Sequence, residues 1–394
     1  QLGGSCINYG CTPTKTMISS ARIAHYARVA PEFGIHPGPV QVNMAEIVAR
    51  KNEIVASFRS GIENQVETNP NLTLYRGHGR FTAPHEIEVT GEKLSSDKIF
   101  INTGTRPRVL PIPGLDQIEF LTNRNIMDLK AVPAHLIALG GNYLGLEFGQ
   151  MFRRLGSEVT VIELGDQIIP REDPEVSQSL KEALQREGLT FQLGAKTTKV
   201  AKTRDGVEIT IEKKDGTTET VKGSHLLVCI GQVPNSDDLG LDKAGVATDK
   251  FGFIQHNGKL ETNVPGVWVL GDVKGGPAFT HVSYDDYLVI YDNLVNGKNR
   301  SIDNRQVPYA LFTDPELGRV GLSEKEARAK GYRLKIGSVP MAYVARAIER
   351  AETNGLMKIV INADNDRILG ATILGPDGGE LVQILMALMM ADAP

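Results

Sequence analysis

The sequence predicts an α/β protein with a βαβ unit in the middle of the chain. Three observations support this prediction: HLIALGG (135–141) has the pattern of a buried strand, NYLGLEFGQMFRRLG (142–156) has helical spacing, and EVTVIE (158–163) is again strand-like. A strand, a Gly-rich turn, a helix and a second strand in this order form the βαβ unit of a parallel sheet. With 394 residues, the chain has room for two or three domains.

The part of the chain before this unit alternates between helices and short strands. A helix is expected to start at Thr12-Pro13, because Thr is a good N-cap and Pro a good first helical residue. A second helical pattern covers residues 44–67. Three short strands are then expected in LTLYRG (72–77), HEIEVTG (85–91) and KIFINTG (98–104).

The part after the unit continues with further strands and helices. Asp173-Pro174 starts a helix, and residues 208–221 form a hairpin with Asp215-Gly216 at its turn. HLLVCIG (225–231) and GVWVLGD (266–272) are short buried strands, the second leading into a helix after about Thr280. The last part is predicted to hold a capped helix, several strands and a Met-rich helix.

Composition excludes several classes of protein. The chain is 41% apolar and 23% charged, as expected for a globular protein, and its net charge of −4 gives no reason to expect nucleic acid or an anionic membrane surface as a partner. The most apolar stretch, residues 381–391, is much shorter than the roughly 20 residues of a membrane span. Three cysteines do not make a disulfide scaffold, so we expect a cytoplasmic protein.

Because the chain opens on QLGGSC and stops at MMADAP, directly after a helical pattern, we also expect it to be truncated at both ends.

The stretch CINYGCTPTK (6–15) contains two of the three cysteines. A thiolate is the reactive form of cysteine, and a helix N-terminus favours it electrostatically. Cys11 directly precedes the predicted helix start, so it is the better candidate for a stabilised thiolate. Cys6 is expected in the preceding loop or turn, where it can face an incoming partner, and Lys15 supplies positive charge one turn into the helix. This arrangement favours redox chemistry.

Two other interpretations of the cysteine pair remain open. The pair can be buried and incidental, or it can be half of a zinc site. Zinc takes four ligands, and the only other cysteine is the distant Cys229, which lies within an apolar strand and is expected to be a core residue. In the same way, Met386, Met389 and Met390 indicate packing rather than binding of a soft metal. We therefore predict no resident metal site.

The second signal is GGNYLG (140–145), which follows a strand and opens a helix, as a dinucleotide fingerprint requires. Phosphates would lie at the helix N-terminus, against free backbone N–H groups. Glu163 ends the next strand, where an acid binds the adenine-ribose hydroxyls, and this favours NADH over NADPH. The second glycine of the motif is replaced by Asn142, whose side chain limits close backbone approach. The alternative is a strand–helix turn that binds nothing.

The third signal is Gly271-Asp272 at the end of the strand GVWVLGD. An Asp there, followed by the small-residue run VKGGPA and a helix, suits hydrogen bonds to a ribityl chain or a sugar. The alternative is an ordinary turn or cap residue. His281 lies near the start of that helix, where it either caps the helix or approaches a flavin.

Together these stretches resemble the flavin-dependent pyridine nucleotide–disulfide oxidoreductases of class I, a family that includes dihydrolipoamide dehydrogenase, glutathione reductase and mercuric reductase. The resemblance covers essentially the whole chain in the right order. The motifs that carry it are GGSCINYGCTPTK for the redox-active disulfide, FINTGTRP for the crossover, ETNVPGVWVLGD for the second FAD motif, and IGQVPN and LFTDPELGRVGLSEKEA for the return strand and the start of the interface domain.

The resemblance implies a fold of two Rossmann-like domains, one for FAD and one for NAD(P), and an α+β dimerisation (interface) domain that makes a homodimer. The expected boundaries are 1–112 and 232–300 for a discontinuous FAD domain that lacks its first FAD motif, 113–231 for the NAD(P) domain, and 301–394 for an incomplete interface domain. FAD and NADH are the cofactors that it implies, and its partners are a second copy of the chain and a small-molecule or metal-ion electron acceptor.

The resemblance also implies catalytic roles. Electrons would pass from NADH through FAD to a Cys6–Cys11 disulfide, with Cys11 nearest the flavin and Cys6 attacking the substrate. Lys15 and Glu147 would form an ion pair near the flavin, and Tyr143 would gate the nicotinamide pocket. The full set of residues expected at the cofactors comprises Lys15, Thr103, Gly104, Gly140, Gly141, Asn142, Tyr143, Gly145, Glu163, Gly231, Gly271, Asp272 and His281.

Within the family, two groups of stretches favour the metal reductases. RLGSEVTVIE, PREDPEV and TMISSARIAHYAR resemble mercuric reductase, whereas KIFINTG, FTHVSYDDY and MADAP resemble the reactive-chlorine-resistance flavoprotein with copper(II) reductase activity. RILGATILGPDGGELV is shared more widely with dihydrolipoamide dehydrogenases. We therefore expect reduction of a metal ion. A disulfide reductase such as dihydrolipoamide dehydrogenase is the first alternative, and a non-enzymatic, redox-responsive protein that binds FAD and NADH is the second.

Overall fold

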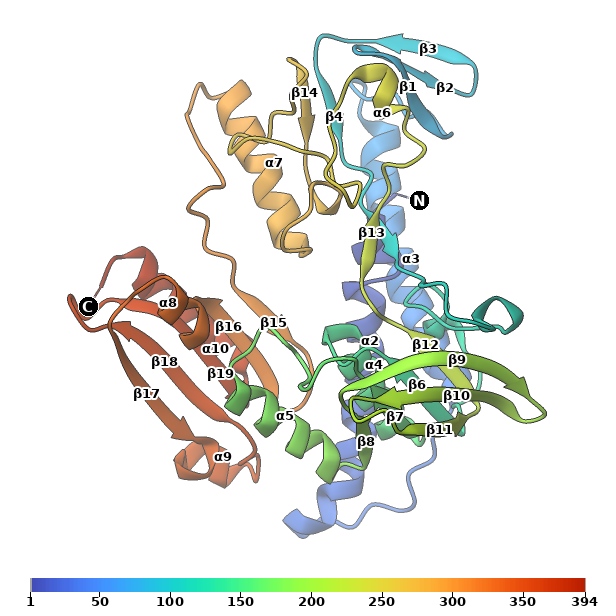
Figure 1. Cartoon of the computed structure of the whole chain (residues 1–394), viewed down its shortest axis with the longest axis vertical. Helices are drawn as coiled ribbons and strands as arrows, with labels where there is room; N and C mark the ends of the chain where they lie inside the picture. The colour runs from blue at the N-terminus through green and yellow to red at the C-terminus, as the bar shows by residue number, and fades with distance from the viewer. Residues whose placement is uncertain (1, 394) are drawn as a thin grey trace. The chain divides into compact units, whose positions relative to one another are not determined.

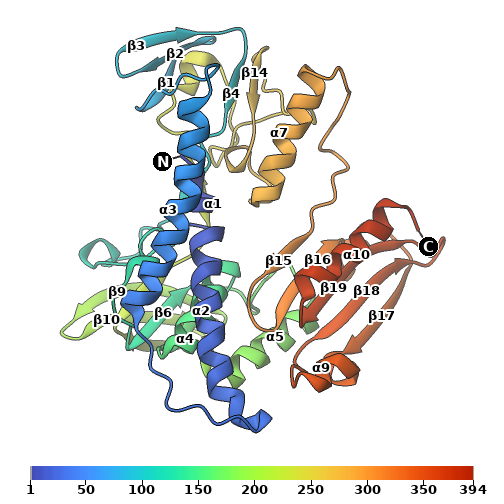
Figure 2. The same ribbon diagram turned by 180° about the vertical axis from the view of Figure 1, so that it is seen from behind.

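The computed structural model describes residues 2–393, which divide into two compact units. The first unit consists of the segment ending at Asn8, Ala56–Arg108 and Gly231–Val307, and the second of Tyr9–Val55, Val109–Ile230 and the chain from Pro308 onward. Figures 1 and 2 show the elements from two opposite sides. The fold is α/β, as the sequence predicts.

The first unit contains three small sheets. An antiparallel meander joins β1, β2 and β3, a parallel pair joins β4 and β14, and an antiparallel pair joins β5 and β13. Its elements are α1 (Gly4–Asn8), the second half of α3 (Met44–Thr68), β1 (Gly79–Ala83), β2 (Glu86–Val89), β3 (Glu92–Ser95), β4 (Ile99–Ile101), β5 (Thr105–Pro107), β13 (Gln232–Pro234), α6 (Leu241–Ala244), β14 (Val267–Val269), the 3-10 helix η4 (Asp272–Lys274) and α7 (Thr280–Leu294).

The strand predicted in LTLYRG (72–77) is wrong. This segment belongs to no strand, and Leu72 and Leu74 are exposed. The first strand is β1 instead, in which the buried Phe81 lies opposite Ile87 of β2. Alternating apolar residues make a strand only where a partner strand satisfies their backbone groups, and none pairs with residues 72–77.

The second unit contains the predicted βαβ unit, formed by β6, α4 and β7. A parallel sheet runs in the order β12-β6-β7-β8, and β9, β10 and β11 form an antiparallel sheet. The elements are α2 (Cys11–Val29), η1 (Ala30–Phe33), η2 (Leu115–Gln117), η3 (Ile126–Asp128), β6 (His135–Leu139), α4 (Tyr143–Leu155), β7 (Glu158–Ile162), α5 (Pro174–Arg186), β8 (Leu189–Gln192), β9 (Ala195–Thr203), β10 (Gly206–Lys213), β11 (Thr218–Gly223) and β12 (His225–Val228).

Helix α4 is the centre of the core of this unit. It packs against β7 and β6 and lies beside α2 (Figure 2). Phe148 and Phe152 are fully buried, and burial of each such side chain stabilises the fold by roughly 1.5–3 kcal/mol. This packing holds the start of α4, which carries the GGNYLG motif, against the carboxyl ends of the parallel strands.

The last part of the chain forms a five-stranded antiparallel sheet in the order β15-β16-β19-β18-β17, with α10 packed against β16 and β19 (Figure 1). The capped helix predicted in this part is α8, whose start has a capping box between Ser323 and Glu326. The elements are β15 (Tyr309–Leu311), β16 (Glu316–Gly321), α8 (Glu324–Ala329), β17 (Leu334–Pro340), η5 (Met341–Tyr343), α9 (Ala345–Glu349), β18 (Leu356–Asn362), β19 (Ile368–Gly375) and α10 (Gly378–Met390).

No helix within residues 2–393 combines the length and the apolar character that crossing a membrane requires.

Candidate functional site

Helix α2 starts earlier than the sequence predicts, so the assignment of Thr12 as its N-cap is wrong. Gly10 is the N-cap, and its carbonyl accepts a hydrogen bond from the Thr14 N–H at 3.1 Å. Cys11 is therefore the first helical residue, and it is exposed. The positive end of a 19-residue helix lies at this residue, which favours a thiolate electrostatically.

Cys6, expected in a loop or turn, lies in a one-turn helix, α1. The Asn8 side-chain amide closes this turn by donating to the carbonyls of Leu2 and Gly4, at 2.9 and 2.8 Å. Arg59 of α3 in turn donates to the Asn8 Oδ1 from two guanidinium nitrogens, at 2.9 and 2.6 Å. This local network, which no periodicity in the sequence signals, fixes the backbone that carries Cys6.

Lys15 and Glu147 form the ion pair that the resemblance implies. The Lys15 Nζ lies 2.7 Å from the Glu147 Oε2, and the Glu147 side chain is only 5% exposed. The second carboxylate oxygen accepts the Phe312 N–H at 2.9 Å, and the Lys15 ammonium lies 4.5 Å from the centre of the Phe312 ring. The pair therefore holds a positive charge one turn into the helix that begins with Cys11.

The GGNYLG loop has the close backbone approach that a dinucleotide site requires. Gly140 has φ +113°, and a Cβ at Gly145 would overlap the Gly140 carbonyl oxygen. Only glycine lets the first turn of α4 pack this tightly on the end of β6. Tyr143, the predicted gate, is the first residue of α4.

Asn142 is the N-cap of α4. Its backbone is extended, with φ −107° and ψ −172°, so no left-handed conformation is needed at this position. Its side-chain oxygen accepts the Tyr143 N–H at 3.0 Å. Asn142 therefore replaces glycine without backbone strain and takes up one of the N–H groups at the helix start.

Both carboxylate oxygens of Glu163 bind backbone amides. Oε2 accepts the Gly141 N–H at 2.7 Å, and Oε1 accepts the Gly165 N–H at 2.8 Å. Glu163 thus lies against the glycine loop at the end of β7, as a ribose-binding acid would. Each oxygen retains a lone pair for a further donor.

Cys229 packs against the core beneath the same loop, as predicted. Its thiol donates to the Leu139 carbonyl at 2.9 Å. Burial, with a smaller contribution from Glu163, raises the pKa of this thiol to about 12. Cys229 therefore stays protonated at neutral pH and is chemically unlike a thiolate nucleophile.

In the first unit, Gly271 and Asp272 form a sharp turn after β14. Gly271 has φ +72°, and a Cβ there would overlap the Asn102 side chain. The fully buried Asp286 of α7 accepts the Gly271 N–H at 2.9 Å and binds Lys274 and Arg305 at 3.3 and 2.7 Å. The sequence analysis did not predict a role for Asp286. The available signal was an acidic residue on an otherwise apolar face of the helix, which indicates a buried charge with a partner.

Asp272 is held by a hydrogen bond from Thr105 at 3.4 Å. Burial is the main cause that raises the pKa of its carboxyl, against smaller opposing contributions from Thr105 and Lys274. A hydroxyl group that donates a hydrogen bond to this carboxylate would stabilise its charged form, because the protein itself supplies few donors to it. This fits a ribityl hydroxyl as its ligand.

The remaining predicted residues shape the backbone around this turn. The Thr103 hydroxyl donates to the Asn235 carbonyl at 2.7 Å, and the Gly104 carbonyl accepts the Asn235 N–H at 2.9 Å. The Gly231 carbonyl accepts the Arg108 N–H at 2.9 Å. His281 is exposed at the start of α7 and stacks on Phe279, with ring centres 5.5 Å apart; Phe279, not His281, is the N-cap.

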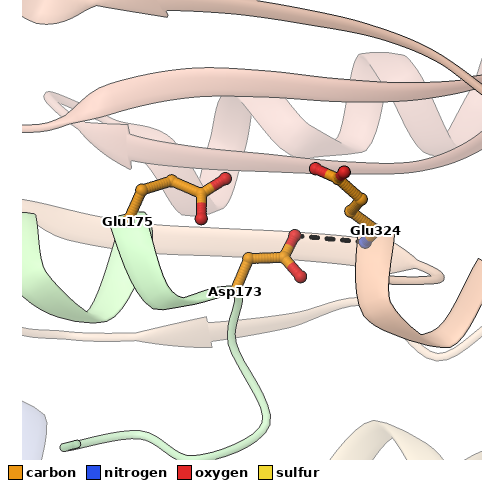
Figure 3. A group of neighbouring side chains, drawn as sticks. All are labelled: Asp173, Glu175 and Glu324. Carbon is orange, nitrogen blue, oxygen red and sulfur yellow. Dashed lines mark hydrogen bonds between the residues drawn. The ribbon is translucent and has the colours of Figure 1, made fainter.

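Three acids for which the sequence indicated no common site converge in the second unit. Asp173 and Glu175 at the start of α5 face Glu324 at the start of α8 (Figure 3). Their carboxylate oxygens lie within 4.8 Å of one another, a spacing that suits a metal ion. The Lys358 ammonium already binds all three, at 3.0 Å from Asp173, at 2.8 Å from Glu324, and in contact with Glu175. This cluster is therefore an ion network centred on lysine.

Comparison with known proteins agrees with this geometry. The sequence matches the pyridine nucleotide-disulphide oxidoreductases over residues 1–286 and the dimerisation domain of these enzymes over residues 307–394. The chain belongs to the pyridine nucleotide-disulphide oxidoreductase family. The resemblance inferred from the motifs is confirmed, and the dimerisation domain supports a homodimer.

Individual relatives come from several branches of this family. The chain is 37% identical to the dihydrolipoyl dehydrogenase of Thermus scotoductus, with 97% of this chain and 82% of that protein covered. It is 33% identical to the mercuric reductase of Lysinibacillus sphaericus, over 97% of this chain and 70% of that protein. The Cu(II) complex of the HOCl-induced flavoprotein disulfide reductase RclA from Escherichia coli has a TM-score of 0.89 at 31% identity and covers all of this chain and 86% of that one.

Membership in this family makes the protein a FAD-dependent oxidoreductase that uses a pyridine nucleotide. Its residues fit both cofactors. The tight glycine approach at the start of α4 suits a pyrophosphate, and the Gly271-Asp272 turn suits a ribityl chain.

Proposed function

We propose that this protein is an NADH-dependent metal-ion reductase that acts on mercuric or copper(II) ions through Cys6 and Cys11. The observation that carries the proposal is the place of Cys11, exposed at the first position of a 19-residue helix with the Lys15–Glu147 pair one turn away. Both features stabilise a thiolate. The mercuric reductase relative and the Cu(II) complex of RclA support a metal ion as the acceptor.

The proposed electron balance has two halves. Bound FAD supplies the chemistry that turns a hydride from NADH into two electrons for a disulfide. In the first half, NADH and a proton reduce the Cys6–Cys11 disulfide to two thiols, and NAD⁺ leaves. In the second half, the two thiols release two protons to solvent, their thiolates return two electrons, either to one mercuric ion or singly to two copper(II) ions, and the disulfide forms again.

In this proposal each residue has a distinct task. Cys11 is the thiolate held on the flavin side by the start of α2, and Cys6 in α1 meets the acceptor. Lys15 stabilises negative charge, and buried Glu147 fixes the direction of the Lys15 side chain. The FAD domain comprises residues 1–112 and 232–300, the NAD(P) domain residues 113–231, and the interface domain residues 301–394.

The choice of acceptor is tested by turnover. The full-length protein, purified with FAD, is expected to oxidise NADH with mercuric or copper(II) ions at a kcat/KM at least about tenfold above that for lipoamide. The Thermus dihydrolipoyl dehydrogenase relative favours the opposite order. Preference for lipoamide would make the protein a disulfide reductase. Bound FAD and NADH with negligible turnover on every acceptor would make it a non-enzymatic redox-responsive protein.

The preference for NADH is tested at Glu163. In Glu163→Arg, the carboxylate that would repel a 2′-phosphate becomes a guanidinium that binds it, so the ratio of kcat/KM for NADPH to that for NADH is expected to rise about tenfold or more. The change also removes the hydrogen bonds from the Gly141 and Gly165 N–H groups, and this is expected to weaken the binding of both coenzymes. The ratio of the two kcat/KM values is therefore the decisive quantity. Glu158→Arg, at the exposed start of the same strand, is the control. An unchanged ratio in Glu163→Arg would mean that this carboxylate does not face the ribose.

A further inference from the structure

Asp286 holds the backbone on both sides of Asp272. Its Oδ2 accepts the N–H of Gly271, the residue directly before Asp272, at 2.9 Å. The same oxygen lies 3.3 Å from the Nζ of Lys274, which ends the three-residue helix η4 that Asp272 begins. One carboxylate oxygen therefore ties down the residue that precedes Asp272 and the residue that closes its short helix.

Asp286 is itself held firmly in α7. Its side chain is fully buried, and its second oxygen, Oδ1, accepts from the Arg305 guanidinium at 2.7 Å. Arg305 is held in turn by the neighbouring Asp285 at 3.1 Å. A buried carboxylate with two cations is costly to desolvate, and apolar packing would often stabilise a fold as well. The concentration of these charges on one short turn therefore points to a task in orienting that turn.

Lys274 is the cation that competes for the Asp272 carboxylate. Its side chain is 2% exposed, and its ammonium is directed at Asp286 and at the Gly275 carbonyl, at 3.3 and 3.2 Å. Burial is the main cause that raises the pKa of Asp272, whereas Lys274 lowers this pKa and Asp286 raises it, so both charges act on the carboxyl. An ammonium bound to a carboxylate takes up lone pairs that a ligand hydroxyl would otherwise use. By binding Lys274, Asp286 leaves those lone pairs open.

We propose that Asp286 is a positioning residue of the flavin site, which orients the Gly271-Asp272 turn and holds Lys274 away from Asp272, so that Asp272 is available to the ribityl hydroxyls of FAD. This inference rests on the proposed role of Asp272 at the ribityl chain. Asp286 acts through the two residues that it binds and makes no contact with the ligand.

The test uses the full-length protein and measures the dissociation constant for FAD, by diluting the FAD-loaded protein and following the rise of flavin fluorescence as FAD is released. Asp286→Asn keeps the size of the side chain and an oxygen for the Gly271 N–H, but it removes the charge that holds Lys274. Lys274 then turns to Asp272, so the dissociation constant is expected to rise at least about tenfold.

A second change separates this competition from a general structural effect. Asp286→Asn combined with Lys274→Met removes the competing cation as well, so the dissociation constant is expected to return to within about threefold of that of the unaltered protein. A purely structural role of the ion pair predicts the opposite, namely that the double variant binds FAD as weakly as Asp286→Asn or more weakly.

Asp292→Asn is the matched control. Asp292 lies on the same helix, nearly two turns further on, and binds Lys298 and Arg300 at 3.1 and 3.0 Å. This change also takes a carboxylate from two cations, but it leaves the Gly271-Asp272 turn with its partners. The dissociation constant for FAD is therefore expected to change less than twofold, whatever happens to the melting temperature.

Thermal unfolding will show whether Asp286→Asn folds. If it does not, Asp286→Glu decides, because it keeps the charge but moves the carboxylate by one methylene group, and the dissociation constant is expected to rise about threefold. An unchanged constant in the folded variant, or a double variant without recovery, would overturn the inference. Failure of the proposed role of Asp272 is a separate result, since Asp272→Asn would then bind FAD as tightly as the unaltered protein.

Discussion

Replacing Lys358 with Met is expected to lower the free energy of unfolding by about 3–5 kcal/mol, because it leaves Asp173, Glu175 and Glu324 facing one another without a cation. The Lys358 side chain is 2% exposed and that of Asp173 is 5% exposed, so water reaches the Asp173 carboxylate poorly once the ammonium is removed. Met preserves most of the side-chain volume, which separates the loss of charge from the creation of a cavity. The apparent melting temperature followed by circular dichroism is expected to fall by roughly 5 °C.

Lys335 on the neighbouring strand β17 is the matched control. It also pairs with an acid, Asp366, at 2.5 Å, but its side chain is 58% exposed. Lys335→Met is therefore expected to cost less than about 1 kcal/mol. Equal losses in the two variants would show that the Lys358 network contributes no more than a surface ion pair.

The effect of Lys358→Met also depends on pH. Hydrogen bonds from Lys358 and Arg328 lower the pKa of Glu324, so its contribution to stability is present above its ordinary pKa of 4.5 and is lost as the pH falls through the lowered value. Burial opposes the charge of Lys358, but its bonds to the three acids raise its pKa above 10.5, and its contribution is lost only in strong alkali. The difference between the two proteins is expected to be constant from about pH 6 to 9 and to shrink below about pH 4.5.

Replacing Cys11 with Ser is expected to lower the rate of metal-ion reduction by at least about 10³-fold, because serine supplies neither a thiolate nor a disulfide. In the unaltered full-length protein, anaerobic titration with NADH is expected to produce the long-wavelength absorbance of a thiolate–flavin charge-transfer interaction. Cys11→Ser is expected to abolish this band, since Cys11 is the residue stabilised by the start of α2.

Cys6→Ser is the matched partner of this experiment. It removes the other half of the disulfide, so turnover is expected to be lost as well, but the Cys11 thiolate and its absorbance band are expected to remain. If the band survives in Cys11→Ser and disappears in Cys6→Ser, the tasks of the two cysteines are reversed. Survival of the band in both variants would exclude both cysteines as its source.

The local sequence pattern was sufficient to predict the βαβ unit and the glycine positions at its first turn. Hydrophobic periodicity and helix capping depend on residues that are close in the sequence. The βαβ unit and the helix start at Asp173-Pro174 could therefore be predicted from the sequence. Local patterns predicted the wrong structure where the same residues are compatible with two local conformations. The choice of Gly10 over Thr12 as N-cap, and the unpaired segment at 72–77, depended on contacts that the neighbouring residues do not encode.

The sequence by itself determined the family and the Gly-rich turn that opens α4, because motif chemistry lies within short segments. Only the tertiary structure decided the buried charge networks. Glu172 meets Tyr309 across 137 positions of the chain, and Lys358 meets Glu175 across 183. No local period indicates such pairs, because a buried charge is stabilised by whichever partner the fold brings to it, and that partner is chosen by packing rather than by sequence distance.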